Sequence, residues 1–407
     1  MSPIAESPPK RHNVAEFQEA FNLEQFSLKS RLGADRELIH DIILAKKSFN
    51  RKLREVGARN LRIIKGVSSL DGRTTSPEAR GSLAAGIDGG GTKTTIAVAQ
   101  TNGALVGIKR IGPTRLGLIS ATEAANRLGE GFAEILGPNW LSEIGYACFG
   151  FGGLETGKSK DKAISIAETV LSGQDNYLVT GDGTIGLHCG TFGRPGLSII
   201  AGTGTLLVAE DPHGQKGRVD GWGHLFGDLG SAYYIGRQVV KTVLEAFDGR
   251  GDSTILKNML LENLGLEEVP ALVDHFYNKE RTPTAIAELA PLAHSAALKG
   301  DAVAECILED ASKEVLHSAT TLIRRLNMGK LDPLRVVLIG GVFTSDLVRK
   351  KVRGELENSF ENIKIIRPSW EPVTGAIYLA LRNMGLEITK SVETRLQEDF
   401  NLQEPRN

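Results

Sequence analysis

Gly86-Ile-Asp88-Gly-Gly-Gly91-Thr92-Lys93-Thr94 stands between two runs of β-forming residues, and the fold prediction depends on it. Three consecutive glycines allow backbone N–H groups to approach phosphate oxygens without a clash from Cβ atoms. Thr92 adds a hydroxyl, and Asp88 adds a carboxylate that can hold Mg²⁺ through water. A glycine-rich hairpin that only turns the chain is the alternative, although a turn needs fewer glycines. We expect a phosphate-binding loop made of Asp88, Gly89, Gly90, Gly91, Thr92 and Lys93.

The glycine loop joins the first two strands of a predicted antiparallel meander, whose β-like runs cover residues 83–88, 94–100 and 104–110. Asn102-Gly103 predicts a type I′ turn between the last two runs, because both central residues of that turn have positive φ. Helix-like and strand-like runs then alternate over residues 121–136, 144–151, 160–171 and 176–180. A meander followed by this alternation predicts an α/β lobe that is not a plain Rossmann unit.

The second half of the chain repeats this pattern about 115 residues later. A strand-like run at 197–200 leads into Gly202-Thr-Gly-Thr205, a second run at 206–210 and a turn at 211–214. Such self-similarity predicts two related lobes. Two Gly-Thr loops that face each other would hold the β- and γ-phosphates from opposite sides, as phosphoryl transfer requires. We expect Thr203, Gly204 and Thr205 to form the second loop, although a plain hairpin is the alternative for this loop alone.

The rest of the second lobe is predicted from a helical stretch that starts at Asp228, a strand at 335–339 and a helix near 373–383. The strand runs into Gly340 and Gly341, where the backbone can approach an adenine or ribose closely. Tight packing between a strand and a helix explains these glycines equally well.

Asp182 follows the strand-like run at 176–180. A carboxylate just beyond a strand end can accept the proton of an attacking sugar hydroxyl, which contributes typically 10²–10⁴ in rate. The alternative is a helix N-cap or a local Asx turn.

Gly221-Trp-Gly-His224-Leu-Phe-Gly227-Asp228 combines small backbone positions, an aromatic ring and a carboxylate. Sugars need hydrogen-bond acceptors for their hydroxyls and an apolar surface for the ring face, so this segment suits a sugar. The alternative is a structural loop in which Asp228 caps the next helix.

Gly152, Gly157, Lys158 and Ser159 match the P-loop pattern and lie between a strand-like and a helix-like run. Against a P-loop, Glu155 would place a carboxylate among the phosphates. The P-loop is therefore kept as an alternative.

Length and composition limit the classes of function. A chain of 407 residues exceeds one comfortable core. With 48 Lys and Arg against 49 Asp and Glu, a nucleic-acid partner is not expected. Three widely separated cysteines support neither a disulfide framework nor a zinc or iron–sulfur site. Since we find neither a membrane-length apolar run nor a secretion signal, we expect a cytoplasmic protein without membrane contact.

Residues 1–80 are rich in Lys, Arg and Glu and poor in Gly, and their apolar spacing predicts two amphipathic helices. Residues 68–82 have the composition of a linker. We assign this extension no chemistry.

With these motifs in place, the sequence resembles the N-acetylglucosamine kinase family, in the BadF/BadG/BcrA/BcrD-type group of the actin-like ATPase superfamily. The resemblance covers residues 84–386 and is most specific in 200–205 and 221–233, with support from Glu371-Pro-Val-Thr-Gly-Ala. It implies an α/β fold with two duplicated, ribonuclease H-like lobes. The expected parts are an extension and linker at 1–82, lobes at 83–196 and 197–372, and a C-terminal helix and tail at 373–407.

The resemblance also implies roles for single residues. Asp182 would be the base, Asp88 would hold the metal, and Gly340 and Gly341 would lie near the nucleoside. The expected sugar contacts are Thr114, Arg115, Gly221, Trp222, Gly223 and Asp228. Arg115 stands where the family usually has a sugar-binding Asn, Thr205 replaces the usual Ser, and Gly-Thr-Ile-Gly follows Asp182 in place of an Ala-rich helix start.

The function that these observations predict is an ATP- and Mg²⁺-dependent kinase acting on an amino sugar such as N-acetylglucosamine or glucosamine. A homodimer is left open. The alternatives are an ATPase that activates a redox enzyme, of the benzoyl-CoA reductase or 2-hydroxyacyl-CoA dehydratase type, a sugar-sensing protein and a P-loop NTPase.

Overall fold

The computed structural model describes residues 81–401 except 92, 115, 118, 155–156 and 278–282. The chain divides into compact units at Met1–Ser76 and Pro77–Asn407. The helices predicted within residues 1–80 lie outside the described residues, as do Thr92 and Arg115.

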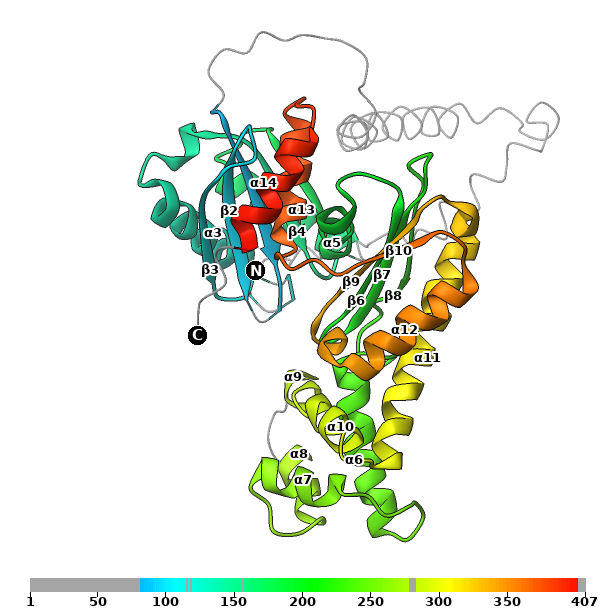
Figure 1. Ribbon diagram of the computed structural model, residues 1–407. Coiled ribbons are helices and arrows are strands. Elements are labelled where there is room, and N and C mark those ends of the chain that lie inside the picture. Colours follow the sequence, from blue (N-terminus) through cyan, green and yellow to red (C-terminus); the bar gives the residue numbers. More distant parts are fainter. Residues whose placement is uncertain are drawn as a thin grey trace, which may run out of the picture. The chain divides into compact units, whose positions relative to one another are not determined.

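Two five-stranded sheets form the framework of the second unit (Figure 1). The strands are β1 (Leu83–Gly89), β2 (Thr94–Gln100), β3 (Leu105–Ile111), β4 (Ile144–Phe151), β5 (Tyr177–Gly181), β6 (Gly196–Ala201), β7 (Thr205–Glu210), β8 (Lys216–Asp220), β9 (Leu334–Ile339) and β10 (Ile363–Ile366). The first sheet has the order β3-β2-β1-β4-β5 and the second β8-β7-β6-β9-β10. In each sheet the first three strands are antiparallel and the later two join in parallel. This equivalence confirms the two related α/β lobes.

The helices fall into a group around the first sheet and a larger group on the second. The first group is α3 (Ala121–Leu136), α4 (Gly157–Val170), α5 (Asp182–Thr191), α13 (Val373–Asn383) and α14 (Lys390–Asn401). The second group is α6 (Ala232–Phe247), α7 (Leu256–Leu264), α8 (Ala271–Tyr277), α9 (Pro283–Ala287), α10 (Ala290–Ala297), α11 (Ala302–Arg325) and α12 (Asp346–Ser359). Short 3₁₀ helices are η2 (Trp140–Ser142), η3 (Met328–Lys330) and η4 (Gly341–Thr344).

Alternating residues of the first sheet enter two different cores. Ile87 on β1 belongs to a buried cluster with side chains of α3 and α4, such as Phe132 and Ile166. Ala84, three positions earlier, belongs to a cluster with α13. Since successive side chains of a strand point to opposite faces, helices cover both faces of this sheet.

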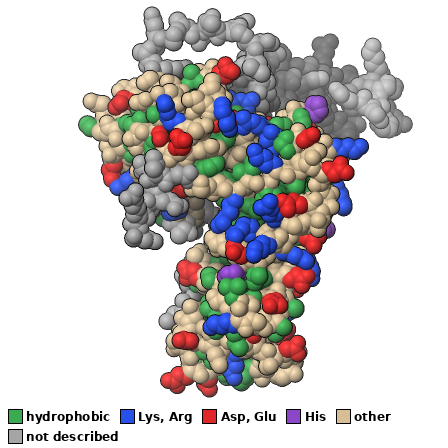
Figure 2. Space-filling model, in the orientation of Figure 1, with side chains coloured by type: hydrophobic (Ala, Val, Ile, Leu, Met, Phe, Trp, Pro, Cys, Tyr) green, Lys and Arg blue, Asp and Glu red, His purple; other side chains and the backbone are tan. Residues whose placement is uncertain are grey.

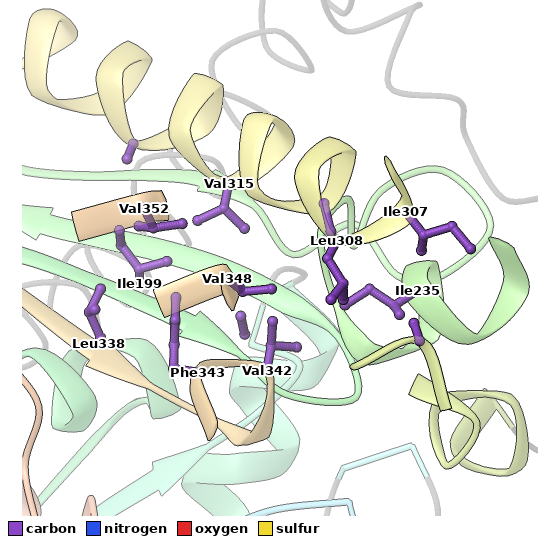
Figure 3. Close-up of a cluster of buried hydrophobic side chains, with 14 of the residues drawn as sticks. Ile199, Ile235, Ile307, Leu308, Val315, Leu338, Val342, Phe343, Val348 and Val352 are labelled. Atoms are coloured by element: carbon purple, nitrogen blue, oxygen red, sulfur yellow. The ribbon is translucent and has the colours of Figure 1, made fainter. Parts of the chain in front are cut away.

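The core of the second sheet lies under α6, α11 and α12. Figure 3 shows Ile199 of β6 and Leu338 of β9 beside Val348 and Val352 of α12, with Val315 of α11 nearby. Burying one such aliphatic side chain contributes about 1.5–3 kcal/mol.

Helix α5 packs against both sheets because one of its faces consists of glycine. Gly183, Gly186 and Gly190 have the spacing i, i+3, i+7 and therefore share a face. Cβ atoms built on them would lie 2.4 Å from Val208, 3.0 Å from Ile339 and 2.5 Å from Val337 in the second sheet. Because Ile185 on the same helix contacts the first sheet, α5 joins the two lobes.

Helix α13 follows a linker at residues 367–372 that leads from β10 back to the first sheet (Figure 1). It crosses α5 at Gly375, where an added Cβ would lie 1.9 Å from the carbonyl oxygen of Ile185. Figure 2 shows several Lys and Arg side chains on the face of the molecule that carries this linker.

Three predictions were wrong. The helix near 373–383, expected to complete the second lobe, is α13 and packs against the first sheet. The β2–β3 turn is not type I′, because only Gly103 has positive φ, and the Gln100 N–H donates to the carbonyl oxygen of Ala104 across a three-residue loop. The helix expected from Asp228 begins at Ala232, with Ser231 as its N-cap. Asp228 has φ +57° and cannot belong to a right-handed helix.

Candidate active site

The first Gly-Thr loop connects β1 to β2 through a tight turn. Gly89 pairs with Thr94 in the ladder, and the Gly90 N–H donates to the carbonyl oxygen of Lys93 at 3.1 Å. A Cβ on Gly89 would lie 2.5 Å from Phe151 and 2.9 Å from the Thr114 hydroxyl. Glycine is therefore required where the loop leaves the strand. Gly91 is exposed, and Thr92 is outside the described residues.

Thr114 packs under this loop and is bonded to the strand that follows it. Its hydroxyl is buried and lies 2.8 Å from the hydroxyl of Thr94, so the two form a hydrogen bond. Since Arg115 is outside the described residues, the structure leaves its predicted sugar contact as a prediction.

Asp88, at the end of β1, lies among other carboxylates. Burial, followed by the negative charges of Asp182 and Glu371, raises the pKa of Asp88 to about 7, and the charge of Lys93 opposes this. Asp88 and Asp182 are therefore electrostatic neighbours although 94 positions separate them in the sequence. A cation placed beside Asp88 would relieve this repulsion.

Glu371, on the linker before α13, binds polar side chains of the first lobe. Its carboxylate accepts hydrogen bonds from Thr95 Oγ1 at 3.0 Å and from Arg110 Nη2 at 2.6 Å, and Lys93 Nζ lies 3.6 Å away. Burial alone would raise the pKa of Glu371, but the Arg110 hydrogen bond, the Lys93 charge and the Thr95 hydroxyl lower it. The charge of Lys93 therefore acts on both Glu371 and Asp88.

Asp182 begins α5 where the two sheets meet. Its Oδ1 accepts a hydrogen bond from the Gly183 N–H at 2.8 Å, and Oδ2 lies 3.0 Å from the Cβ position of Gly152 after β4. The N-cap of α5 is Gly181, so the helix-cap alternative for Asp182 was wrong. The Ser198 hydroxyl of β6 donates to the Gly183 carbonyl at 3.2 Å, which places Asp182 beside the second lobe.

The second Gly-Thr loop connects β6 to β7 in the same way. The Gly202 N–H donates to the Gly204 carbonyl at 2.9 Å, and Thr203 is exposed. Backbone N–H groups at the start of α6, from Ala232 and Tyr233, donate to the carbonyls of Gly202 and Thr203 at 2.8 and 3.2 Å. The loop therefore lies at a helix N-terminus, a position that favours anions.

Asp228 lies against this loop. Its Oδ1 accepts a hydrogen bond from the Thr205 N–H at 3.1 Å, and both carboxylate oxygens lie 2.8 Å from the Cβ position of Gly204. Ser231, whose side chain accepts from the Tyr234 N–H, caps α6, so the helix-capping alternative for Asp228 was wrong.

The aromatic part of the predicted sugar segment is exposed. Gly221 and Gly223 have positive φ and flank Trp222, whose ring is 66% exposed. The Arg218 guanidinium stacks on this ring, 4.6 Å from its centroid.

Gly340 follows β9 and lies beside the second loop. Its φ is +109°, and a Cβ would lie 2.2 Å from the Ala201 carbonyl oxygen. It therefore must be glycine, whereas Gly341 faces open space. A pocket of about 520 Å³ runs from Gly340 along the linker to Arg110 and Phe400. Among the described residues, its lining includes Gly340 and Glu371 but neither the Gly-Thr loops nor Asp182, so the pocket lies beside the candidate site.

Comparisons with known proteins agree with this geometry. Residues 85–380 match the BadF/BadG/BcrA/BcrD ATPase family, and this range spans both loops and Asp182. The chain belongs to the BadF/BadG/BcrA/BcrD ATPase family.

Two curated relatives of this family member are similar over most of their length. An N-acetyl-D-glucosamine kinase of Dictyostelium discoideum is 31% identical over 314 residues, which cover 73% of this chain and 97% of the relative. An N-acetylmuramic acid/N-acetylglucosamine kinase of Clostridium acetobutylicum is 30% identical over 299 residues, or 72% and 97%.

The fold agrees with a crystal structure of a Chromobacterium violaceum protein assigned as an N-acetylglucosamine kinase. Its TM-score is 0.60 at 23% identity, with 74% of this chain and 99% of that chain covered. The actin-like, two-lobed α/β fold expected from the sequence is thereby confirmed.

The P-loop alternative has little support in this family member. Lys158 is exposed on α4, and Gly152 lies against Asp182. Glu155 is outside the described residues. Within the described part of the chain, no helix has the length and apolar character to cross a membrane.

The sequence did not predict the roles of two carboxylates, those of Glu371 and Asp220. Glu371 was quoted only as part of a motif, and Asp220 was given no role. Glu371 precedes a proline at a helix start, which is a recognisable signal. Asp220 precedes Gly221-Trp-Gly, but the chain does not reveal which backbone groups its carboxylate binds.

Proposed function

We propose that this chain is an ATP-dependent kinase that transfers the γ-phosphate of ATP to a hydroxyl of an amino sugar. One observation carries the proposal: equivalent Gly-Thr loops on duplicated sheets, with Asp182 on the helix that joins the two sheets. The names of the two curated relatives point to N-acetylglucosamine or a related hexosamine. A cytoplasmic location fits this activity.

In this proposal the loops orient the reactants and Asp182 moves the proton. The first loop (Asp88 to Lys93) and the second loop (Thr203 to Thr205) hold the phosphates, and Gly340 and Gly341 lie near the nucleoside. As the sugar oxygen attacks the γ-phosphorus, the bond from that phosphorus to the β–γ bridging oxygen breaks. Asp182 accepts the hydroxyl proton, and ADP leaves.

Asp88 fits a magnesium ion shared with the nucleotide. Its carboxylate is a hard oxygen ligand whose ionised form is disfavoured by burial and by neighbouring acids, so a divalent cation would stabilise it. No group of three or more metal-binding side chains is gathered among the described residues, so phosphate and water would complete the coordination. When bound, Mg²⁺ would neutralise charge on the phosphates.

The sugar would contact the segment from Gly221 to Asp228 and the side chain of Arg115. The predicted contact at Thr114 does not fit, because that side chain is fully buried and its hydroxyl is bonded to Thr94. Trp222 would offer its exposed ring, with Gly221 and Gly223 allowing close approach, and Asp228 would supply a carboxylate. A guanidinium at position 115, where an amide is usual, favours a substituent with acceptor oxygens.

A substrate panel tests the proposal. Release of ADP from ATP would be measured with N-acetylglucosamine, glucosamine, N-acetylmuramic acid and no sugar, and the products would be identified by phosphorus NMR. We expect at least one amino sugar to raise ADP release well above the sugar-free rate and to yield a sugar phosphate. Hydrolysis of ATP that ignores every sugar would contradict the proposal and favour an activator of a redox enzyme.

A further inference from the structure

One carboxylate closes the loop that carries the exposed aromatic side chains. Asp220, the last residue of β8, is only 8% exposed. Its Oδ1 accepts hydrogen bonds from the N–H groups of Gly221 and Asp228, both at 2.8 Å, and its Oδ2 accepts from Leu229 at 3.1 Å. A Cβ on Gly227 would lie 2.5 Å from Asp220 Oδ1. Asp220 therefore ties the first residue of the loop to its last two.

The backbone is strained at the two ends of this loop. Asp220 and Asp228 have φ of +63° and +57°, a region that residues with side chains rarely adopt. Such conformations persist only where surrounding contacts hold them, and they cluster at ligand-binding sites. The three N–H donors to Asp220 supply those contacts.

The last part of the same loop is attached to the second phosphate loop. Asp228 accepts the Thr205 N–H, and its carboxylate lies against Gly204. Between these tied ends, the loop exposes Trp222, Leu225 and Phe226, whose exposed fractions are 66%, 74% and 88%. The tied ends of the aromatic loop are thus bonded to the second phosphate loop, while the apolar side chains between them are open to a ligand.

We propose that Asp220 is a positioning residue that couples occupation of the aromatic loop to the geometry of the second phosphate loop, through Asp228. This inference rests on the proposed function, because it takes the two ligands to be an amino sugar and a nucleotide. A sugar that contacts the loop shifts Asp228, and Asp228 shifts the Thr205 N–H. A nucleotide on the second phosphate loop changes sugar binding through the same bonds, since coupling between two sites is reciprocal.

The measurement is the affinity of the full chain for N-acetylglucosamine by calorimetry, with and without a saturating non-hydrolysable ATP analogue. In the wild type we expect the analogue to tighten sugar binding by about 5-fold or more, the usual range of coupling. In Asp220→Asn, one acceptor oxygen becomes an NH₂ group that faces N–H donors, so we expect the ratio of the two affinities to fall toward one.

Asp211→Asn is the matched control. Asp211 is also 8% exposed, and its Oδ1 accepts N–H groups from His213 and Gln215 at 2.8 Å, which closes the turn at the opposite end of β8. Since none of its contacts involves the phosphate loop, its ratio should equal that of the wild type. In Asp211→Asn the accepting Oδ1 can be kept, so this control reports the loss of a buried charge, and an effect of that loss alone would change both variants alike.

A wild-type ratio of one, or an unchanged ratio in Asp220→Asn, would overturn the inference while leaving the proposed kinase intact. If Asp220→Asn fails to fold, Asp228→Ala cuts the same connection at Thr205, and an unchanged ratio there overturns it equally. A wild type that binds the nucleotide analogue but none of the amino sugars would overturn the proposed function, and this inference with it.

Discussion

Three carboxylates, those of Asp88, Asp182 and Glu371, lie near the first Gly-Thr loop, and two cations, Lys93 and Arg110, lie beside them. The negative charges of Asp182 and Glu371 raise the pKa of Asp88, and the positive charge of Lys93 opposes them. The negative charge of Glu371 is better compensated, because Arg110 and Lys93 lower the pKa of this carboxyl. At the scale of single residues, the charge left for a cation to compensate is therefore that of Asp88.

This imbalance predicts that Asp88 costs stability at neutral pH when nucleotide and metal are absent. The native state holds the Asp88 proton up to a pKa of about 7, whereas an unfolded chain releases it near the ordinary aspartate pKa of 3.8. The free energy of unfolding therefore falls as pH rises between these values, by about 1.4 kcal/mol for each unit of pKa difference at most. Asp88→Asn has no carboxyl at this position, so its free energy of unfolding should not show this fall.

Urea unfolding in EDTA checks the prediction at pH 4 and pH 8. We expect Asp88→Asn to be at least ~1 kcal/mol more stable than the wild type at pH 8 and to lose this advantage at pH 4. The exposed Asp252→Asn should show no such difference. If Asp88→Asn were no more stable than the wild type at pH 8, the account of Asp88 would be wrong.

At this scale the sequence identified residues that stand in motifs but not their partners. Asp88 was recognised because three glycines and a threonine follow it, and Asp182 because it follows a β-like run. Glu371 and Asp220 act through hydrogen bonds to Arg110 and to the N–H group of Asp228, and these pairings depend on the folded chain. Asp228 was predicted to contact a sugar, and its bond to Thr205 could not be foreseen from spacing.

At the scale of elements, glycines determine how closely α5 approaches its neighbours. Its Gly183, Gly186 and Gly190 face the second sheet, and Gly375 of α13 meets its backbone. Glycine inside a helix costs about 1 kcal/mol relative to alanine. Close packing between the lobes must offset this cost.

Gly375→Ala tests whether this crossing joins the lobes. The added methyl would overlap the carbonyl oxygen of Ile185, so we expect the free energy of unfolding to fall by roughly 3 kcal/mol or more. Gly354→Ala in α12 is the control, because its Cβ would meet nothing within 4 Å. That substitution should raise stability by about 0.5–1 kcal/mol. Equal effects of the two in chemical denaturation would refute the packing argument.

Element positions were largely predictable, and turn geometry was not. The predicted run at 144–151 coincides with β4, and that at 94–100 with β2. The Asn102-Gly103 turn forms with three residues instead of two, because a left-handed residue at Gly103 alone allows a type I turn with a bulge. The choice between these turns depends on the strand register.

At the scale of the whole molecule, the duplicated sheets place one Gly-Thr loop at the same position in each lobe. The sequence predicted this duplication because both copies keep the order strand, Gly-Thr turn, strand and hairpin. It could not predict how Asp182 meets the second lobe, since that depends on the packing of α5 against Ser198 and Val208.

The matched region predicts where activity resides. Both curated relatives are covered over 97% of their length by about 73% of this chain, and the family match begins at residue 85. A chain that starts at residue 81 should therefore fold on its own and keep the kcat and KM of the full chain in an ADP-release assay. A large loss of kcat in a folded truncated protein would assign a catalytic role to residues 1–80.

The central claim is that Asp182 accepts the proton of the attacking hydroxyl between two phosphate loops. Its most direct test is kcat for ADP release with the best amino sugar, measured for Asp182→Asn and for Lys158→Ala. We predict that Asp182→Asn lowers kcat by about 10²–10⁴ while the protein stays folded, and that Lys158→Ala is nearly silent. Full activity in Asp182→Asn, or lost nucleotide binding in Lys158→Ala, would contradict this claim.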